Sequence, residues 1–192
     1  MIMTKAASMP GSATLIRGHA IEVVSDRLFG ADSEAGDAPP DEPGWIVTLD
    51  TWLDMMGALS SRRFPVGVTI SPGDDVWRLR DEHGLVAGTA MMAYIAVDFP
   101  SFTDGRGYSH AQTLRQHLHY AGELRATGDV LLDTLFYLHR CGFDSFVLKH
   151  GHDAHQASSA LSSFTHVYQR GYRASSSADD ADTLPMSNLP AG

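Results

Sequence analysis

Short apolar runs alternate with segments of helical periodicity from Trp45 to Arg170. The runs are four to eight residues long and rich in branched side chains, which is typical of strands buried in a sheet. The segments between them carry apolar residues three and four positions apart, which indicates helices packed on that sheet. We expect strands at 45–49, 65–70, 91–98, 123–127 and 146–149, with helices opening at Asp50, Ser109, Asp129 and Ala154 and a further helix through Val76.

Alternating strands and helices of these lengths predict an α/β fold with a mostly parallel sheet. About four to five strand-helix units fit in the chain, which is too few for a complete eight-fold barrel. The first prediction is a single domain with an open sheet and helices on both faces. A partial, barrel-like array of strand-helix units is the alternative.

The chain divides into three parts by composition. Residues 1–44 read as a flexible N-terminal segment with one or two edge strands between Thr14 and Val24, followed by an acidic linker at 30–44. Residues 45–173 form the α/β domain, and residues 174–192 read as a disordered acidic tail.

The net charge of −9 lies mostly on the flanks, because the three parts carry −4, −2 and −3. A nearly neutral domain offers no electrostatic footprint for nucleic acid. No apolar run is long enough to span a membrane, and the N-terminus does not read as a signal peptide. The single cysteine, Cys141, forms no internal disulfide and is expected to be a small buried side chain. We therefore expect a cytoplasmic protein that binds neither nucleic acid nor membrane.

Ligands of parallel sheets bind beyond the carboxyl ends of the strands. The loops predicted there hold the candidate ligand-binding residues Asp104, Arg106, Gly107, Ser109, Arg125, Gly128 and Asp129. Arg106 and the amides at the start of the next helix could bind a small oxyanion. Alternatively, Asp104 and Arg106 pair with Asp129 and Arg125 and only lock the two loops together. Both interpretations stay open at the level of sequence.

Glu123 and Arg125 alternate with apolar residues and so share one face of their strand. A charged pair on a central strand needs partners. For Glu123 a structural ion pair is favoured, whereas Arg125 could equally face a pocket.

Other constellations favour structural roles. His150, His152 and His155 are closely spaced, and His117 and His119 flank a leucine, but solvated surface histidines are favoured over a metal site. Asp129 and Asp133 share a helix face but supply too few oxygens for a hard cation. No nucleotide-binding glycine motif, Walker loop or hydrolase elbow is present, and one cysteine cannot hold an iron–sulfur cluster. The motifs identify no cofactor and no catalytic residue.

Several longer motifs resemble a known family. They are AVDFP at 96–100, FTDGRGYS at 102–109, YAGELRA at 120–126, GDVL at 128–131 and RCGFD at 140–144. Together they resemble the bacterial domain of unknown function 934 family, whose members are often labelled "oxidoreductase probably involved in sulfite reduction". The likeness covers about Trp45 to Tyr168. Thr134 departs from it by standing where a glutamine is expected after Asp133.

The resemblance implies a bacterial, cytoplasmic protein associated with assimilatory sulfite reduction, and it implies no mechanism. Three hypotheses follow. The protein is an accessory protein that docks on sulfite reductase or its electron donor and presents an oxyanion site. It is an oxidoreductase that borrows a flavin or nicotinamide. Or it is a non-catalytic regulator that binds a small anionic sulfur metabolite through the same loops.

Overall fold

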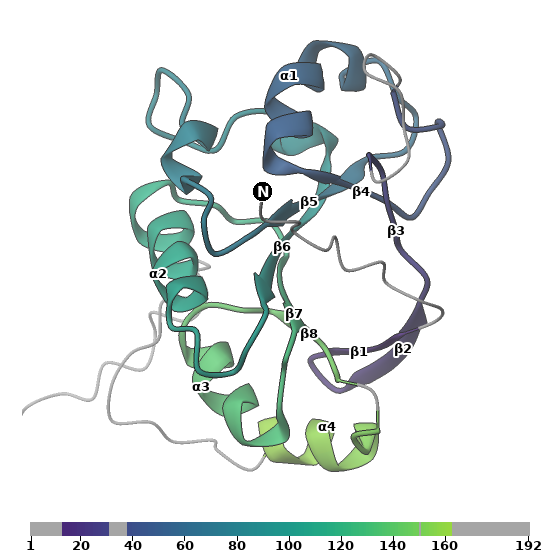
Figure 1. Ribbon diagram of the computed structural model, residues 1–192, viewed down its shortest axis with the longest axis vertical. Coiled ribbons are helices and arrows are strands. Elements are labelled where there is room, and N and C mark those ends of the chain that lie inside the picture. The colour runs from purple at the N-terminus through teal and green to yellow at the C-terminus, as the bar shows by residue number, and fades with distance from the viewer. Residues whose placement is uncertain (1–12, 31–37, 150, 163–192) are drawn as a thin grey trace, which may run out of the picture.

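The computed structural model describes residues 13–30, 38–149 and 151–162, and these form one sheet of eight strands with helices beside it (Figure 1). The strands are β1 (Ala13–Arg17), β2 (Ala20–Val24), β3 (Arg27–Leu28), β4 (Trp45–Thr48), β5 (Val66–Ile70), β6 (Met92–Phe99), β7 (Leu124–Gly128) and β8 (Ser145–Val147). Their order across the sheet is β2-β1-β8-β7-β6-β5-β4-β3. Strands β3 to β8 run parallel, whereas β1 is antiparallel to both β8 and β2.

The helical elements follow the strands in the chain. They are α1 (Leu49–Leu59), the 3₁₀ turns η1 (Val76–Leu79) and η2 (Thr89–Met91), α2 (Arg106–Gln112), the π-helical turn η3 (Thr113–His117), the 3₁₀ turn η4 (Leu132–Thr134), α3 (Leu135–Arg140) and α4 (Ala154–Ser162). Within the described residues, no helix is both long enough and apolar enough to cross a membrane.

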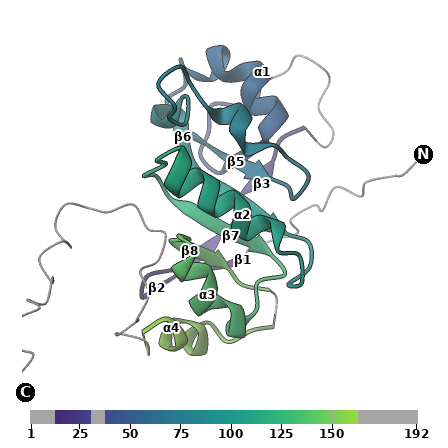
Figure 2. The ribbon, with the colours of Figure 1, turned by 90° about the vertical axis from the view of Figure 1, so that its left-hand side faces the viewer.

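The four α-helices of the described residues cover the same face of the sheet, so the expectation of helices on both faces is wrong (Figures 1 and 2). Strands β4 to β8 lie side by side in chain order without a reversal. Right-handed crossovers that always step in one direction place every helix on one side. The main apolar core lies between helices and sheet and includes Trp52, Leu114, Leu138 and Ala157, one from each helical region.

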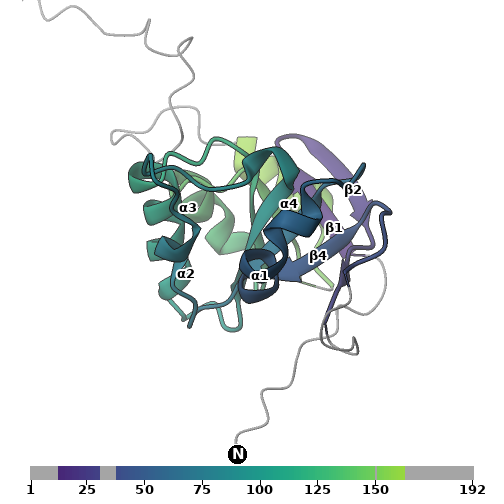
Figure 3. The ribbon, with the colours of Figure 1, turned by 90° about the horizontal axis from the view of Figure 1, so that it is seen from above.

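The sheet curls around its uncovered face into a half-barrel, as the view from above shows (Figure 3). The barrel-like alternative is therefore the better description. The sheet has more strands than expected because the segment at 13–28 supplies three. The edge strands expected between Thr14 and Val24 are present as β1 and β2, and β1 lies inside the sheet rather than at its edge.

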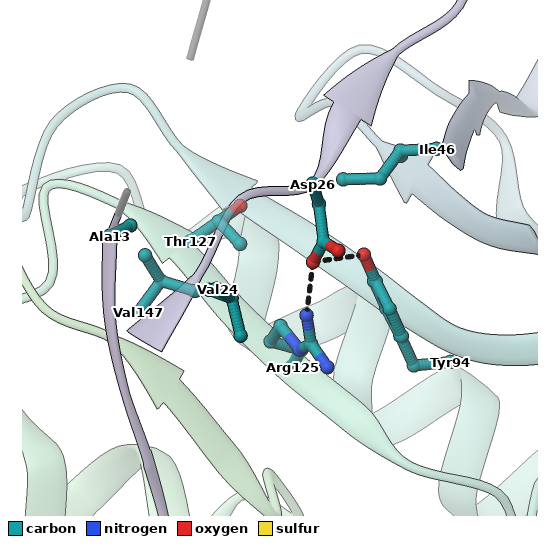
Figure 4. Close-up of a pocket in the computed structure, with 8 residues that line it drawn as sticks. All are labelled: Ala13, Val24, Asp26, Ile46, Tyr94, Arg125, Thr127 and Val147. Carbon is teal, nitrogen blue, oxygen red and sulfur yellow. Dashed lines mark hydrogen bonds and ion pairs between the residues drawn. The ribbon is translucent and has the colours of Figure 1, made fainter. Parts of the chain in front are cut away.

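Only Ser25 and Asp26 separate β2 from β3, and these two strands form the opposite edges of the sheet. The link therefore runs across the open side of the curl, with Asp26 beside the inner face (Figure 4). An exposed edge strand that is long and flat can pair with another chain and cause aggregation. In this sheet the edge strand β3 has only two residues, and the link between β2 and β3 connects the two edges.

Three helix starts differ from the sequence expectation. The helix expected to open at Asp50 begins at Leu49, with Thr48 as its N-cap. The helix expected at Ser109 begins at Arg106, because the Asp104 carboxylate accepts the Arg106 backbone N–H at 3.1 Å. Asp129 caps no helix, and its carboxylate accepts from a neighbouring loop. The helix after it begins at Leu135, following the η4 turn. At the end of α3, Gly142 takes the positive φ of 100° expected of a residue that terminates a helix.

The π-helical turn η3 directs a buried arginine toward the amino ends of the strands. Arg115 Nε donates to the Gly142 carbonyl at 2.9 Å, and Nη1 donates to the carbonyls of Tyr120 and Gly122 at 2.5 and 2.9 Å. Nη2 pairs with Asp144. These contacts tie η3 to the two segments that precede β7 and β8, so Arg115 is a structural residue.

Candidate functional site

The uncovered, inner face of the sheet carries the polar groups that could form a site. Along β6 the residues Tyr94, Ala96 and Asp98 alternate with Ile95, Val97 and Phe99, which belong to the main core. Tyr94 and Ala96 pack instead in a small inner cluster, so Asp98 also belongs to the inner face. On β7 the inner residues are Arg125 and Thr127.

Arg125 lies at the centre of this face with its side chain only 5% exposed (Figure 4). Its Nη1 donates to Asp26 Oδ2 at 2.8 Å, and its Nε and Nη2 donate to Glu123 Oε1 at 3.0 and 2.8 Å. The guanidinium stacks 3.5 Å from the centre of the Tyr94 ring. A buried cation with two carboxylate partners and an aromatic face is fully compensated.

Tyr94 completes this arrangement from the other side of Asp26. Its hydroxyl donates to Asp26 Oδ2 at 2.7 Å. Burial raises the pKa of Tyr94 well above its usual value, and the nearby Asp26 carboxylate raises it further, so the hydroxyl stays protonated. Gly67 on β5 leaves room for the ring, because a Cβ there would lie 2.5 Å from it.

The charges continue toward β1 and β2 as an alternating chain. Arg17 Nη2 pairs with Glu123 Oε2 at 3.0 Å, and Arg17 Nη1 pairs with Glu22 at 2.8 Å. Ser145 Oγ donates to Glu123 Oε1 at 2.6 Å. Burial alone would raise the pKa of Glu123, but the Ser145 hydrogen bond and the two arginines lower it overall. The ion pair expected for Glu123 and Arg125 is thus confirmed as one part of a longer network.

A small cavity remains above this network, inside the curl (Figure 4). It is lined by Ala13, Val24, Asp26, Ile46, Tyr94, Arg125, Thr127 and Val147. Its free volume of about 10 Å³ is close to the room needed by one water molecule. The Asp26 carboxylate therefore fills the space that a small ligand of Arg125 would need.

Asp98 differs from the paired charged groups at the centre of the inner face. It is half-buried near the carboxyl end of β6 and has no hydrogen bond or ion pair with any residue that the structure describes. Burial raises its pKa. The neighbouring Thr127 hydroxyl donates instead to the Val97 carbonyl at 3.3 Å. A half-buried carboxylate without a partner is costly, and such groups occur often at functional sites.

The loop after β6 holds the other predicted cation. Arg106 Nε and Nη2 donate to Asp104 at 3.0 and 2.6 Å, and these bonds lower the pKa of Asp104 to about 2. The Arg106 side chain is 62% exposed. Gly107 packs against the Phe99 ring, where a Cβ would lie 2.5 Å away, and Ser109 is exposed.

The turn after β7 lies beside this loop, as the sequence predicted. The Asp129 backbone N–H donates to the Phe99 carbonyl at 2.7 Å, and the Phe102 N–H donates to Asp129 Oδ2 at 3.0 Å. Asp129 Oδ1 accepts from Lys149 Nζ at 2.6 Å. Gly128 has a φ of 90°, and a Cβ there would collide with the Phe99 carbonyl and lie 2.7 Å from Asp98 Oδ1.

The predicted residues thus separate into two groups. Asp104, Arg106, Gly107, Ser109, Gly128 and Asp129 lie in the two adjacent turns, whereas Arg125 lies within the curl and is paired with Asp26 and Glu123. The alternative in which Arg125 and Asp129 pair with the Asp104 loop is wrong, because Asp104 pairs with Arg106 itself and Asp129 pairs with Lys149. The ligand-binding role of these residues stays a prediction.

Sequence reasoning missed Asp26, Tyr94 and Asp98. Asp26 falls in the N-terminal segment that composition separates from the domain, and nothing local indicates that it reaches the inner face. A signal did exist for the other two. Tyr94 and Asp98 share a face of β6 by strand parity, and one polar face on an otherwise apolar strand marks an inner surface.

The remaining candidates show no ligand-binding geometry. Among the described residues, no three His, Cys, Asp or Glu side chains gather to hold a metal ion. His117, His119 and His155 are exposed, while His150 lies outside the described residues. Cys141 is buried as expected, and burial raises the pKa of its thiol.

Comparisons with known proteins place the chain in a family. No curated protein and no solved structure matches it. Residues 67–178 match the family described as "Bacterial protein of unknown function (DUF934)", a segment that contains β5 from its second residue, β6 to β8 and all seven predicted site residues. Asp26 and Arg17 lie outside the matched segment. Since the match covers more than half of the 192 residues, the chain belongs to this family of bacterial proteins of unknown function.

Proposed function

We propose that the protein is an accessory protein of sulfite reduction that binds a small, singly charged oxyanion at Arg125 and Tyr94. In this proposal the Asp26 carboxylate occupies the anion position when no ligand is bound. The observation that carries it is the convergence of two donors, Arg125 Nη1 and Tyr94 Oη, on a single carboxylate oxygen of Asp26.

The Asp26 carboxylate is itself a small oxyanion, so its partners report what the position accepts. A guanidinium N–H and a tyrosine O–H are both strong donors to anionic oxygen. The raised pKa of Tyr94 keeps that O–H available as a donor. Asp26 lies in a two-residue link rather than within a strand, so it can leave without breaking a ladder of the sheet.

The charge balance of the inner face also supports an exchange of one anion for another. Arg17 and Arg125 balance Glu22 and Glu123, and the carboxylate of Asp26 adds one negative charge next to Arg125. A singly charged ligand in its place leaves the buried charge unchanged, which avoids the cost of adding an unpaired ion.

The link to sulfite reduction is supported by the resemblance of the motifs at 96–144 to proteins that carry that label. Near neutral pH sulfite is present partly as hydrogensulfite, a small oxyanion with the same single negative charge as the Asp26 carboxylate. An accessory role is preferred to a catalytic one because the free space beside Arg125 suits a few atoms and not a flavin or nicotinamide ring.

Anion binding is tested with Asp26→Asn, which removes the competing charge but keeps a hydrogen-bonding side chain. Sulfite should raise the melting temperature of this variant by about 3 °C at ten times the dissociation constant, and raise that of wild type less. The matched control is Asp50→Asn, because Asp50 is 71% exposed and pairs with Arg78 outside the curl. A response equal in wild type and both variants, or no response at all, contradicts the anion site.

The biological role is tested separately by deleting the gene in its host. Growth on sulfate or sulfite as the only sulfur source should fail and should be restored by cysteine or sulfide. The same strain should grow normally when the wild-type gene is returned. Normal growth of the deletion strain on sulfite contradicts the pathway, whatever the outcome of the binding experiment.

A further inference from the structure

Asp98 is left without a role by the proposed anion site, although it lies on the same inner face. The charged groups at the centre of that face all have partners of opposite sign, whereas Asp98 has none among the described residues. Its carboxylate is directed toward the turn after β7, since Oδ1 would lie 2.7 Å from a Cβ on Gly128. Gly128 thus leaves room for this carboxylate.

The position of Asp98 suits contact with a ligand. It lies near the carboxyl end of a parallel strand and on the concave side of a curled sheet, where strand-helix proteins bind their ligands. The pairing register sets it level with Thr127, one of the residues that line the cavity. The carboxylate is half-buried, so it is partly removed from water but still reachable from the open end.

A half-buried carboxylate without a partner is best compensated by a positively charged group of a ligand. A hard metal ion is disfavoured, because it requires several oxygen ligands and the described residues gather no three metal-binding side chains. An ammonium group needs fewer protein contacts, and one carboxylate with nearby carbonyl or hydroxyl oxygens can bind it.

Asp98 lies just beyond the cavity that Arg125 and Thr127 line, toward the carboxyl ends of the strands. Arg125 pairs with Ala96 and Thr127 pairs with Asp98, so the two charged residues are one strand and two residues apart. Strand spacing makes this a Cα–Cα distance of about 8 Å. By their backbone positions, the two residues of opposite charge are thus a short molecule's length apart, with Thr127 between them.

From this juxtaposition we infer that the ligand is a small zwitterion whose anionic group takes the place of Asp26 at Arg125 and whose ammonium group binds Asp98. The inference rests on the proposed anion site and adds the second contact. The ligand class is an amino acid or aminosulfonate with a short spacer between its two charges. Asp98 is then a specificity residue that separates zwitterions from simple anions.

The test compares two probes that differ only in the ammonium group. Taurine carries an ammonium and a sulfonate on two carbons, and ethanesulfonate lacks the ammonium. Binding is measured by calorimetry and thermal shift on wild type and on Asp26→Asn, in which the anion position is free of a competing charge. Taurine should bind Asp26→Asn about tenfold more tightly than ethanesulfonate, as expected of a charge-assisted hydrogen bond.

Asp98→Asn, alone and combined with Asp26→Asn, should abolish that preference while leaving ethanesulfonate binding intact. Retention of ethanesulfonate binding also shows that the doubly substituted protein is folded. If both probes bind Asp26→Asn equally, the role of Asp98 is wrong and the anion site stands. If neither probe nor sulfite binds wild type or Asp26→Asn, both proposals are wrong.

Discussion

Charged side chains are buried and paired at the centre of the inner face, whereas at the carboxyl end they include exposed cations and a carboxylate without a described partner. At the centre, Arg125 is almost fully buried, and its guanidinium contacts two carboxylates and an aromatic ring. At the carboxyl end, Asp98 has no partner in the described part of the chain, and Arg106 and Lys149 each contact one carboxylate while remaining more than half exposed. The charges at the centre are fully paired, because a buried charge without partners is excluded by its cost.

At the carboxyl end, ion pairs can be replaced at little energetic cost, whereas at the centre Arg125 must keep an anionic partner, either Asp26 or the proposed ligand. Exposed ion pairs contribute little to stability, so their loss or replacement by a ligand is cheap. A half-buried carboxylate without a partner lowers stability and is retained where it serves binding or catalysis. Along the same two strands, the sheet thus passes within two residues from a fully paired charge network to the carboxylate of Asp98, which has no partner among the described residues.

The largest effect should come from breaking the central network. Arg125→Met keeps the length of the side chain but leaves Asp26 and Glu123 beside each other without their shared cation. We expect a loss of about 3–5 kcal/mol in the free energy of unfolding, measured by urea denaturation followed by circular dichroism.

The matched control for this variant is Arg106→Met in the exposed loop, which should unfold at nearly the same urea concentration as wild type. If the two variants are destabilised to a similar extent, burial does not set the difference between the two regions. The contrast between centre and carboxyl end would then have no energetic basis.

Replacing Asp98 should have a smaller effect than replacing Arg125, and it should raise the stability of the protein rather than lower it. Burial raises its pKa in the folded protein above the ordinary value of 3.8, so the folded state holds the proton more tightly than the unfolded chain. Its contribution to stability is intact below pH 3.8 and is lost as the pH rises through the folded pKa. Asp98→Asn should therefore melt about 2 °C above wild type near neutral pH, and this difference should vanish below pH 3.8.

Asp129→Asn supplies a control whose sign is reversed. The Lys149 hydrogen bond, together with that from Phe102, lowers the pKa of Asp129. Its contribution to stability is therefore present above pH 3.8 and is lost as the pH falls through the lowered, folded pKa. This variant should melt below wild type near neutral pH. Shifts of the same sign in the two variants would contradict the assigned environments.

The sequence predicted the parts of the molecule that depend on local pattern. The apolar runs located β4 to β8, and the polar turns after β6 and β7 were expected to lie together, as the Phe102 and Asp129 contact confirms. Parity along the strand also paired Glu123 with Arg125. Each of these follows from residues close in sequence or from the parallel arrangement of consecutive strands.

The features that escaped prediction depend on long-range closure. Neither periodicity nor turn residues reveal that β1 pairs with β8, or that a two-residue link crosses the open side of the curl. Asp26 therefore looked like part of a flanking segment, and Arg125 looked free to meet Arg106. The side of the sheet that the helices cover also depends on strand order, which a sequence of strands and helices leaves open.

The pairing of β1 with β8 has a consequence for how the chain is made. Leu15 finds its neighbour Val147 only after nearly all of the sheet has left the ribosome. Until then the early hairpin has no β8 strand to pair with. Closing so long a loop is slow compared with the local helix contacts, so the nascent chain must hold an unfinished, open-sided sheet throughout synthesis.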